Sequence, residues 1–210
     1  MTRAQVTGAR AAFPRRLDAE VTLRLPEERY SPEAAALVRA HRSELAEWLP
    51  WVTEDFSVEE AREFARANLR QYAAGEGFSV QIVYRGRVAG NAGYNSIDWL
   101  NRRTEIGYWL APPFQGRGVM TRTCRFLIGH AFGALGLNRV EILCAVGNLR
   151  SCAVPERLGF RREGVLREAE WVRDHFNDLV VYSMLAADWP GAASGTEAGV
   201  EGGLTGGETN

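Results

Sequence analysis

A glycine-containing turn between a strand-like and a helix-like segment most limits how this chain can fold. The turn, Gln115 to Met120, follows an alternating segment at 104–110 and precedes apolar residues at helical spacing. The first backbone N–H groups of a helix have no partner within it and lie at the positive end of its dipole. This strand–turn–helix unit is therefore predicted to hold a phosphate or pyrophosphate group.

Two nucleotide-binding folds are disfavoured for this turn. The P-loop needs a lysine after its second glycine, and this chain has no lysine, because all 25 of its basic residues are arginine. The dinucleotide-binding fingerprint needs a third small residue at the position that Thr121 occupies. The remaining alternative is that the glycines serve only a tight turn.

The composition is that of one globular domain. The 210 residues are 46% hydrophobic and 24% charged, which is enough to form a sizeable core. A net charge of −1 argues against a generally basic nucleic-acid binder. The three cysteines have no metal-type spacing, and no apolar run reaches membrane-spanning length. We expect a cytoplasmic protein without a metal, a membrane partner or direct nucleic-acid contacts.

The first half of the chain is predicted to begin with one strand and two helices. The strand covers 21–25, and the first helix begins with Ser31 as its N-cap. The second helix begins at the capping box of Ser57 and Glu60 and runs to about 73. Alternating residues then predict three antiparallel strands, at 78–84, 88–97 and 104–110.

The second half is predicted to complete an α+β fold. It contains a long helix that ends at Gly136, a strand, a short helix beginning at Ser151, and two closing strands, at 140–146, 151–158, 160–167 and 171–185. We expect a mixed, mostly antiparallel twisted sheet of about seven strands with about four helices on both faces. Residues 20–188 would form the domain, 1–19 a flexible segment, and 189–210 a disordered glycine-rich tail. No helix has a surplus apolar stripe, so an oligomer is not indicated.

Several motifs in this order resemble the GNAT N-acetyltransferase superfamily over roughly residues 20–188. They are the turn at 115–118, Asn148-Leu149-Arg150-Ser151, and Leu158-Gly159-Phe160. Within that superfamily the chain resembles the RimJ/RimL-type branch, which acetylates ribosomal-protein N-termini. The segments that indicate this branch are Trp48-Leu49-Pro50-Trp51, Tyr108-Trp109-Leu110 and the run at 163–167.

The resemblance implies that acetyl-CoA is the co-substrate. Its pyrophosphate would bind the backbone amides of the turn, and its pantetheine arm would enter a gap between the strands that end near Leu110 and Val146. A backbone N–H near Trp109 would polarise the thioester carbonyl. Met120 departs from the usual glycine or alanine. The implied cofactor-binding residues are Trp109, Leu110, Gln115, Gly116, Arg117, Gly118, Val119, Met120, Thr121, Asn148 and Ser151.

The candidate catalytic residues are two glutamates and a serine. Glu170 has the spacing of the base in the RimL-type branch, and Glu105 lies where other members place theirs; either is alternatively a solvated strand residue. The tyrosine that often protonates the leaving thiolate is replaced by Pro155. The resemblance gives that role to Ser151, which is alternatively only a helix N-cap. Asn148 would bind the pantetheine arm or be a turn residue.

Three functions follow from these features. The first is acetylation of a protein N-terminal amine, such as that of a ribosomal protein. The low pKa of this amine demands less of the base than the pKa of a lysine side chain does. The second is acetylation of a small amine such as a polyamine, antibiotic or toxin. The third is a sensor that binds acyl-CoA without turnover. Acceptor choice is assigned to the segments at 47–56 and 168–178.

Overall fold

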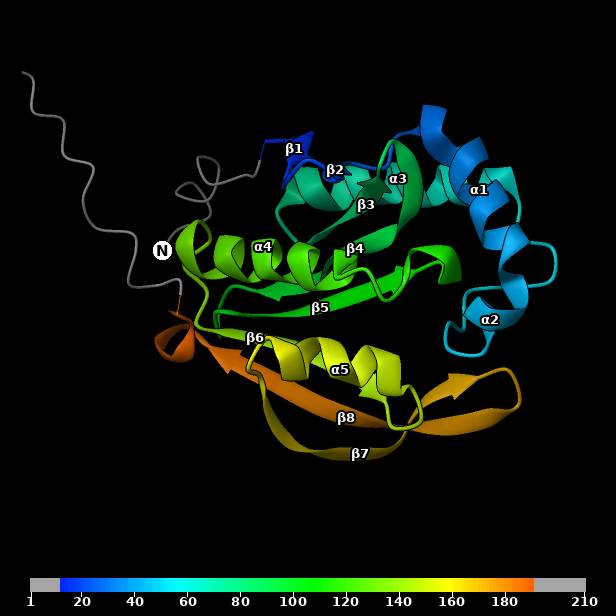
Figure 1. The fold of residues 1–210 in the computed structure, drawn as a ribbon. Helices are drawn as coiled ribbons and strands as arrows, with labels where there is room; N and C mark the ends of the chain where they lie inside the picture. The colour runs from blue at the N-terminus through cyan, green and yellow to red at the C-terminus, as the bar shows by residue number, and fades with distance from the viewer. Residues whose placement is uncertain (1–11, 191–210) are drawn as a thin grey trace, which may run out of the picture.

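A single mixed sheet organises the computed structural model, which describes residues 12–190 (Figure 1). Its strands are β1 (Arg15–Arg16), β2 (Val21–Arg24), β3 (Phe78–Tyr84), β4 (Arg87–Asp98), β5 (Arg103–Leu110), β6 (Arg139–Ala145), β7 (Arg161–Val172) and β8 (His175–Leu185). Its α-helices are α1 (Ser31–Ala40), α2 (Arg42–Ala46), α3 (Val58–Ala74), α4 (Val119–Gly133) and α5 (Leu149–Arg157). Short 3-10 helices are η2 (Glu28–Tyr30), η3 (Pro112–Phe114) and η4 (Ala186–Asp188).

The strand order is β1-β2-β3-β4-β5-β6-β8-β7, and every pair except β5–β6 is antiparallel. This confirms the predicted mixed α+β fold, with eight strands where about seven were expected. The additional strand is β1, which pairs with β2 inside the segment that was expected to be flexible, where Phe13 also packs against Tyr72 and Phe78. Residues 1–11 and 191–210, which include nearly all of the predicted tail, lie outside the described residues.

Helices cover both faces of the sheet, as predicted. Neighbouring residues of β5 point to opposite faces, because strand side chains alternate. The hydroxyl of Tyr108 reaches α5, whereas Trp109 packs against a cluster of α1 and α2 that contains Val38 and Leu45. Figure 1 shows α4 and α5 on one side of the sheet and α3 on the other. The main core lies beneath α4, where Leu127 and other side chains are fully buried.

Some predicted boundaries are correct and others are wrong. The capping box is confirmed, because Ser57 Oγ accepts a hydrogen bond from the Glu60 N–H at 3.2 Å and the Glu60 carboxylate accepts one from the Ser57 N–H at 2.7 Å. Ser31 is not an N-cap: Tyr30 holds that position, and Ser31 is a buried first residue of α1. The long helix ends at Gly133, three residues before Gly136.

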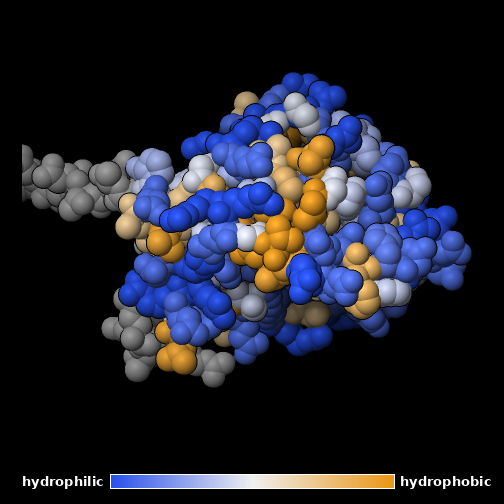
Figure 2. All heavy atoms as spheres, turned by 90° about the horizontal axis from the view of Figure 1, so that it is seen from below, coloured by the Kyte–Doolittle hydropathy of each residue, from blue (hydrophilic) through white to orange (hydrophobic). Residues whose placement is uncertain are grey.

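The predicted gap between the closing strands is also wrong. Strand β7 continues to Val172 through a bulge between Leu166 and Glu170, and Glu168 in that bulge has a φ of 49°. A bulge bends a strand without ending it. Figure 2 views the molecule from the β7 edge and shows hydrophobic surface gathered in its middle, flanked by hydrophilic side chains. No helix within residues 12–190 is long and apolar enough to cross a membrane.

Candidate active site

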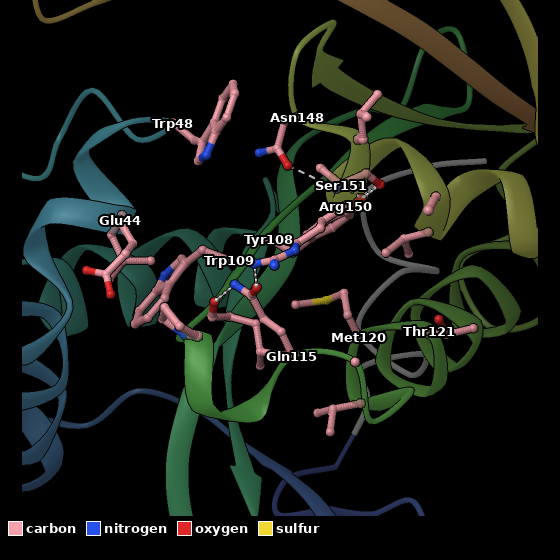
Figure 3. Close-up of a pocket in the computed structure, with 18 of the residues that line it drawn as sticks. Glu44, Trp48, Tyr108, Trp109, Gln115, Met120, Thr121, Asn148, Arg150 and Ser151 are labelled. Carbon is pink, nitrogen blue, oxygen red and sulfur yellow. Dashed lines mark hydrogen bonds between the residues drawn. The ribbon is translucent and has the colours of Figure 1, made fainter.

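A cavity of about 1120 Å³ lies between α2, the end of β5, and the first turns of α4 and α5 (Figure 3). All but one of the predicted cofactor-binding residues line it: Trp109, Leu110, Gln115, Gly116, Gly118, Val119, Met120, Thr121, Asn148 and Ser151. The exception is Arg117, which does not line the cavity. Its side chain is exposed and donates a hydrogen bond to the Pro113 carbonyl at 3.2 Å.

The cavity lies where two neighbouring strands separate. Strands β5 and β6 pair only between 103–105 and 139–141. Beyond Glu105, β5 remains paired with β4, and β6 remains paired with β8, but the two strands no longer pair with each other. The backbone edges that face the split are therefore available to an extended ligand, as an additional strand would be.

The glycine turn has the geometry of an anion-binding loop. Gly116 and Gly118 have φ angles of 71° and 69°, in the left-handed region that favours glycine. Gly118 is the N-cap of α4 and has no side chain with which to cap it. A Cβ atom at either glycine would meet nothing within 4 Å, so the space above the turn is open. Met120 is only 7% exposed and belongs to the main core, although it also lines the cavity.

Gln115 ties the turn to both walls of the cavity. Its Nε2 donates to the Leu110 carbonyl at 2.8 Å, and its Oε1 accepts from Arg150 at 3.0 Å. One side chain thereby links the end of β5 to the first turn of α5. Arg150 also lines the cavity and brings a positive charge close to the glycine turn. No role was predicted for Arg150 from the sequence, although it lies inside one of the motifs.

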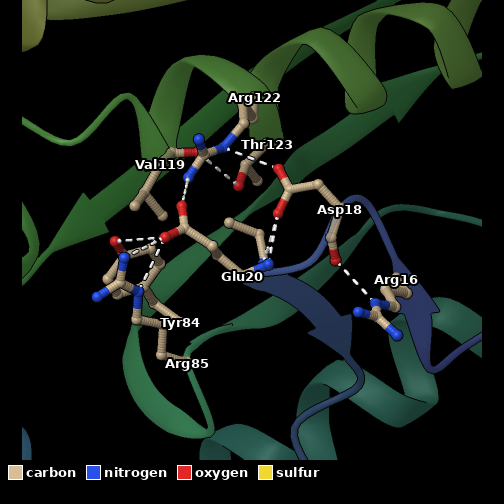
Figure 4. A network of polar contacts seen from close by, with 9 residues as sticks. Arg16, Asp18, Glu20, Tyr84, Arg85, Val119, Arg122 and Thr123 are labelled. Carbon is tan, nitrogen blue, oxygen red and sulfur yellow. Dashed lines mark hydrogen bonds and ion pairs between the residues drawn. The ribbon is translucent and has the colours of Figure 1, made fainter.

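An ion-pair network fixes the first turn of α4 from outside the cavity (Figure 4). Arg122 lies 3.1 Å from the Asp18 carboxylate and 3.4 Å from that of Glu20. The contact with Asp18 is one of charge, because the buried Arg122 Nε has no aligned hydrogen-bond acceptor. Glu20 also accepts from Arg85 Nε at 2.8 Å. The network joins α4 to the segment before β2 and to the β3–β4 turn.

Asn148, not Ser151, is the N-cap of α5. The Asn148 side-chain oxygen accepts from the Ser151 N–H at 3.0 Å, and the helix begins at Leu149. The alternative role of Ser151 as an N-cap is therefore wrong, and its hydroxyl is available for other contacts. Ser151 Oγ lies 3.2 Å from the Tyr108 hydroxyl and 3.1 Å from the Cys144 sulfur.

The two candidate bases lie on the opposite face of the sheet from Ser151. Glu105 alternates with Tyr108 along β5, and Glu170 pairs with Asn177, on the face of β8 away from α5. Burial raises the pKa of Glu170, and the charge of Glu105 raises it further. Burial also raises the pKa of Glu105, against a 2.6 Å hydrogen bond from Asn95. Neither carboxylate lines the cavity.

Two tryptophans, Trp48 and Trp109, line the cavity. The ring of Trp48 lies 3.4 Å from where a Cβ atom of Gly147 would be, so it packs over the loop before α5. Trp51 lies 5.9 Å from Trp109 between ring centroids. Glu44 of α2 and Glu47, the residue after this helix, add two carboxylates to the lining. Within residues 12–190, no three His, Cys, Asp or Glu side chains come together as metal ligands.

Comparisons with known proteins agree with this geometry. A family model described as an acetyltransferase (GNAT) domain matches residues 20–161. YdaF, a candidate ribosomal N-acetyltransferase of Bacillus subtilis (strain 168), is 39% identical over 180 residues, which cover 85% of this chain and 98% of YdaF. The ribosomal-protein-serine acetyltransferase of Escherichia coli (strain K12) is 31% identical over 149 residues, which cover 71% of this chain and 83% of that protein.

A solved structure is similar over most of the chain. It is the RimL ribosomal L7/L12 α-N-protein acetyltransferase in complex with coenzyme A, with a TM-score of 0.77 and 29% identity over 81% of this chain and 96% of that one. The glycine turn, the open space above it and the split between β5 and β6 fit such a ligand. The chain therefore belongs to the GNAT acetyltransferase family and is an acetyl-CoA-dependent N-acetyltransferase.

Proposed function

We propose that this enzyme acetylates the α-amino group of a protein N-terminus, with Glu170 as the base and Ser151 as the donor to the leaving sulfur. The observation that supports this most is the division of the site between the two faces of the sheet. Ser151 lies beside the cavity on one face, and the two glutamates lie on the other. The names of the similar proteins support an acceptor of the ribosomal-protein type.

When bound, acetyl-CoA supplies an activated acetyl group and a thiolate that leaves. The N–H groups at the start of α4 would hold its pyrophosphate, with Arg150 beside them. A backbone N–H near Trp109 or Leu110 would stabilise negative charge on the thioester oxygen. Asn148 would use its amide N–H₂ group on the pantetheine arm, since its oxygen already caps α5.

The amine would approach from the face that holds Glu105 and Glu170. An α-amine has a pKa near 8, so roughly a tenth of it is neutral at pH 7 without assistance. A glutamate with a raised pKa accepts the remaining proton more readily, directly or through one water molecule. Glu105 keeps Glu170 basic through its charge, and it is the second candidate for the base. We place this reaction in the cytoplasm, in agreement with three free cysteines.

A small cationic amine is the second candidate acceptor. Glu44 and Glu47 line the cavity and would attract a polyamine. The two acceptor classes are separated by measuring thiol release and acetyl mass gain with three substrates: a peptide with a free N-terminus, the same peptide with a blocked N-terminus and an internal lysine, and a polyamine. The proposal predicts turnover of the free peptide only. Polyamine turnover without peptide turnover would contradict it, and acetyl-CoA binding without any turnover would favour the sensor.

Glutamate variants test the assignment of the base. Glu170→Gln is expected to lower kcat about a hundredfold, the lower end of typical acid–base contributions. Glu63→Gln is the control, because Glu63 is exposed on α3 and lies outside both segments assigned to acceptor choice. An equal loss in both variants would refute the role of Glu170, and a larger loss in Glu105→Gln would move the base to Glu105.

A further inference from the structure

The hydroxyl of Tyr108 makes two contacts with Ser151 across the split between the strands. It donates to the Ser151 carbonyl at 3.0 Å, and it lies 3.2 Å from Ser151 Oγ. Tyr108 comes from β5 and Ser151 from the first turn of α5. The Cys144 sulfur, on β6, lies 3.1 Å from the same Oγ. Three separate elements therefore meet at the hydroxyl of Ser151.

The number of protons determines the direction of these contacts. A phenol has one proton, and that of Tyr108 is donated to the Ser151 carbonyl, so its oxygen is left to accept. Burial raises the pKa of Tyr108 well above its ordinary value and that of the Cys144 thiol to about 11. Both groups are therefore neutral near pH 7. The Ser151 hydroxyl thus donates its hydrogen bond to neutral partners inside the split. Moving this hydrogen bond to another acceptor costs little.

We propose that Tyr108 is a positioning residue, which orients the Ser151 hydroxyl toward the sulfur of the leaving group. This inference rests on the role proposed above for Ser151. The contact with the Ser151 carbonyl fixes the backbone of the first turn of α5 and thereby the position of Oγ. The contact with Oγ gives the hydroxyl proton a neutral acceptor until the thiolate develops. When a thiolate develops beside it, the hydroxyl rotates and donates to the sulfur. Tyr108 itself does not exchange a proton.

A double-mutant cycle between Tyr108 and Ser151 tests the proposal. Tyr108→Phe is expected to lower kcat about tenfold, as expected for loss of one hydrogen bond, while KM for acetyl-CoA changes less than about twofold. Ser151→Ala should lower kcat at least as much. Because Tyr108 acts through Ser151, adding Tyr108→Phe to Ser151→Ala should change kcat less than about twofold. Multiplicative losses would overturn the proposal, because a merely structural role gives additive free energies.

The matched control is Tyr182→Phe. The Tyr182 hydroxyl also donates to α5, at 2.8 Å to Glu156, which lies five residues beyond Ser151. This variant should keep kcat within about twofold of the wild type, and a tenfold loss would overturn the inference. If Tyr108→Phe does not fold, Tyr108→Met also removes the hydroxyl and fills the site with a flexible side chain.

The cycle is measured as thiol release from acetyl-CoA with the free peptide and with water as the only acceptor. An inactive peptide then counts against the proposed acceptor and leaves the cycle intact, because both reactions expel the same thiolate. If Ser151→Ala leaves both rates unchanged, both the role of Ser151 and this inference fail. If Ser151→Ala lowers both rates but the losses of the two single variants multiply in the double variant, the role of Ser151 stands and that of Tyr108 is refuted.

Discussion

Replacing Gly118 with alanine should separate binding of acetyl-CoA from stability of the fold. Gly118 has a φ of 69°, and a Cβ atom there would meet nothing within 4 Å. The substitution therefore adds backbone strain without a clash. A left-handed alanine costs roughly 1–2 kcal/mol, and the stiffer unfolded chain offsets about 0.4–1 kcal/mol of this. The net loss in free energy of unfolding is expected to be about 1 kcal/mol.

Gly75 provides the matched control for this strain. It has a φ of 70° and equally open surroundings, but it is the C-cap of α3. Gly75→Ala should therefore cost the same stability, and both variants should melt about 2–4 °C below the wild type. Only Gly118→Ala changes the N–H groups at the start of α4. Loss of one hydrogen bond to a charged group costs about 1.5–3 kcal/mol, so its Kd for acetyl-CoA should rise at least tenfold.

Calorimetric titration with acetyl-CoA and thermal unfolding measure the two quantities independently. The reasoning is refuted if Gly118→Ala binds acetyl-CoA as tightly as the wild type while it loses the expected stability. It is also refuted if Gly75→Ala weakens binding of acetyl-CoA equally, because backbone strain outside the glycine turn would then be enough to weaken binding. The stability of Gly118→Asn should lie between that of the wild type and that of Gly118→Ala, since asparagine tolerates the left-handed region better than alanine does.

Three further predictions concern the carboxylates and the helix cap. In the wild type, kcat/KM should fall as pH drops through the raised pKa of Glu170, because protonation removes the base; the residual activity of Glu170→Gln should lack this dependence in a pH–rate profile. Arg139 lowers the pKa of Glu163 to about 2, so this carboxylate stabilises the fold above its ordinary pKa, and the stabilisation is lost as pH falls toward 2. Urea unfolding should accordingly find Glu163→Gln less stable than the wild type at pH 7, with a difference that shrinks on acidification. Asn148→Ala should cost about 1 kcal/mol by thermal unfolding, whereas Asn148→Asp should retain most of the cap.

Local patterns predicted the parts of the fold that local interactions determine. The capping box at Ser57 involves residues three apart, so the sequence contains both partners. The alternation of Val80 and Ile82 reflects the face of β3 that lies in the core. The inward position of Met120 follows from helical spacing with Cys124 and Leu127. Each prediction needed only a few consecutive residues.

Contacts between distant segments determined what the sequence did not predict. β1 has two residues and depends on pairing with β2. Whether Asn148 or Ser151 caps α5 depends on how the chain leaves β6. Alternation along β5 placed Tyr108 on the face of Ile106, but the contact with Ser151 spans 43 positions. The influence of the Glu105 charge on the pKa of Glu170 likewise depends on the strand order, in which β6 and β8 lie between β5 and β7.

The short pairing of β5 with β6 has a mechanical consequence. It joins the two antiparallel parts of the sheet, β1 to β5 and β6 to β8, through three residues on each strand. A molecule bound in the split bridges both parts and extends the junction between them. Because any ligand that prefers the folded state adds to its stability, acetyl-CoA should act as a structural part of the enzyme. Backbone amides at 103–105 and 139–141 should then exchange their hydrogens more slowly when it is bound.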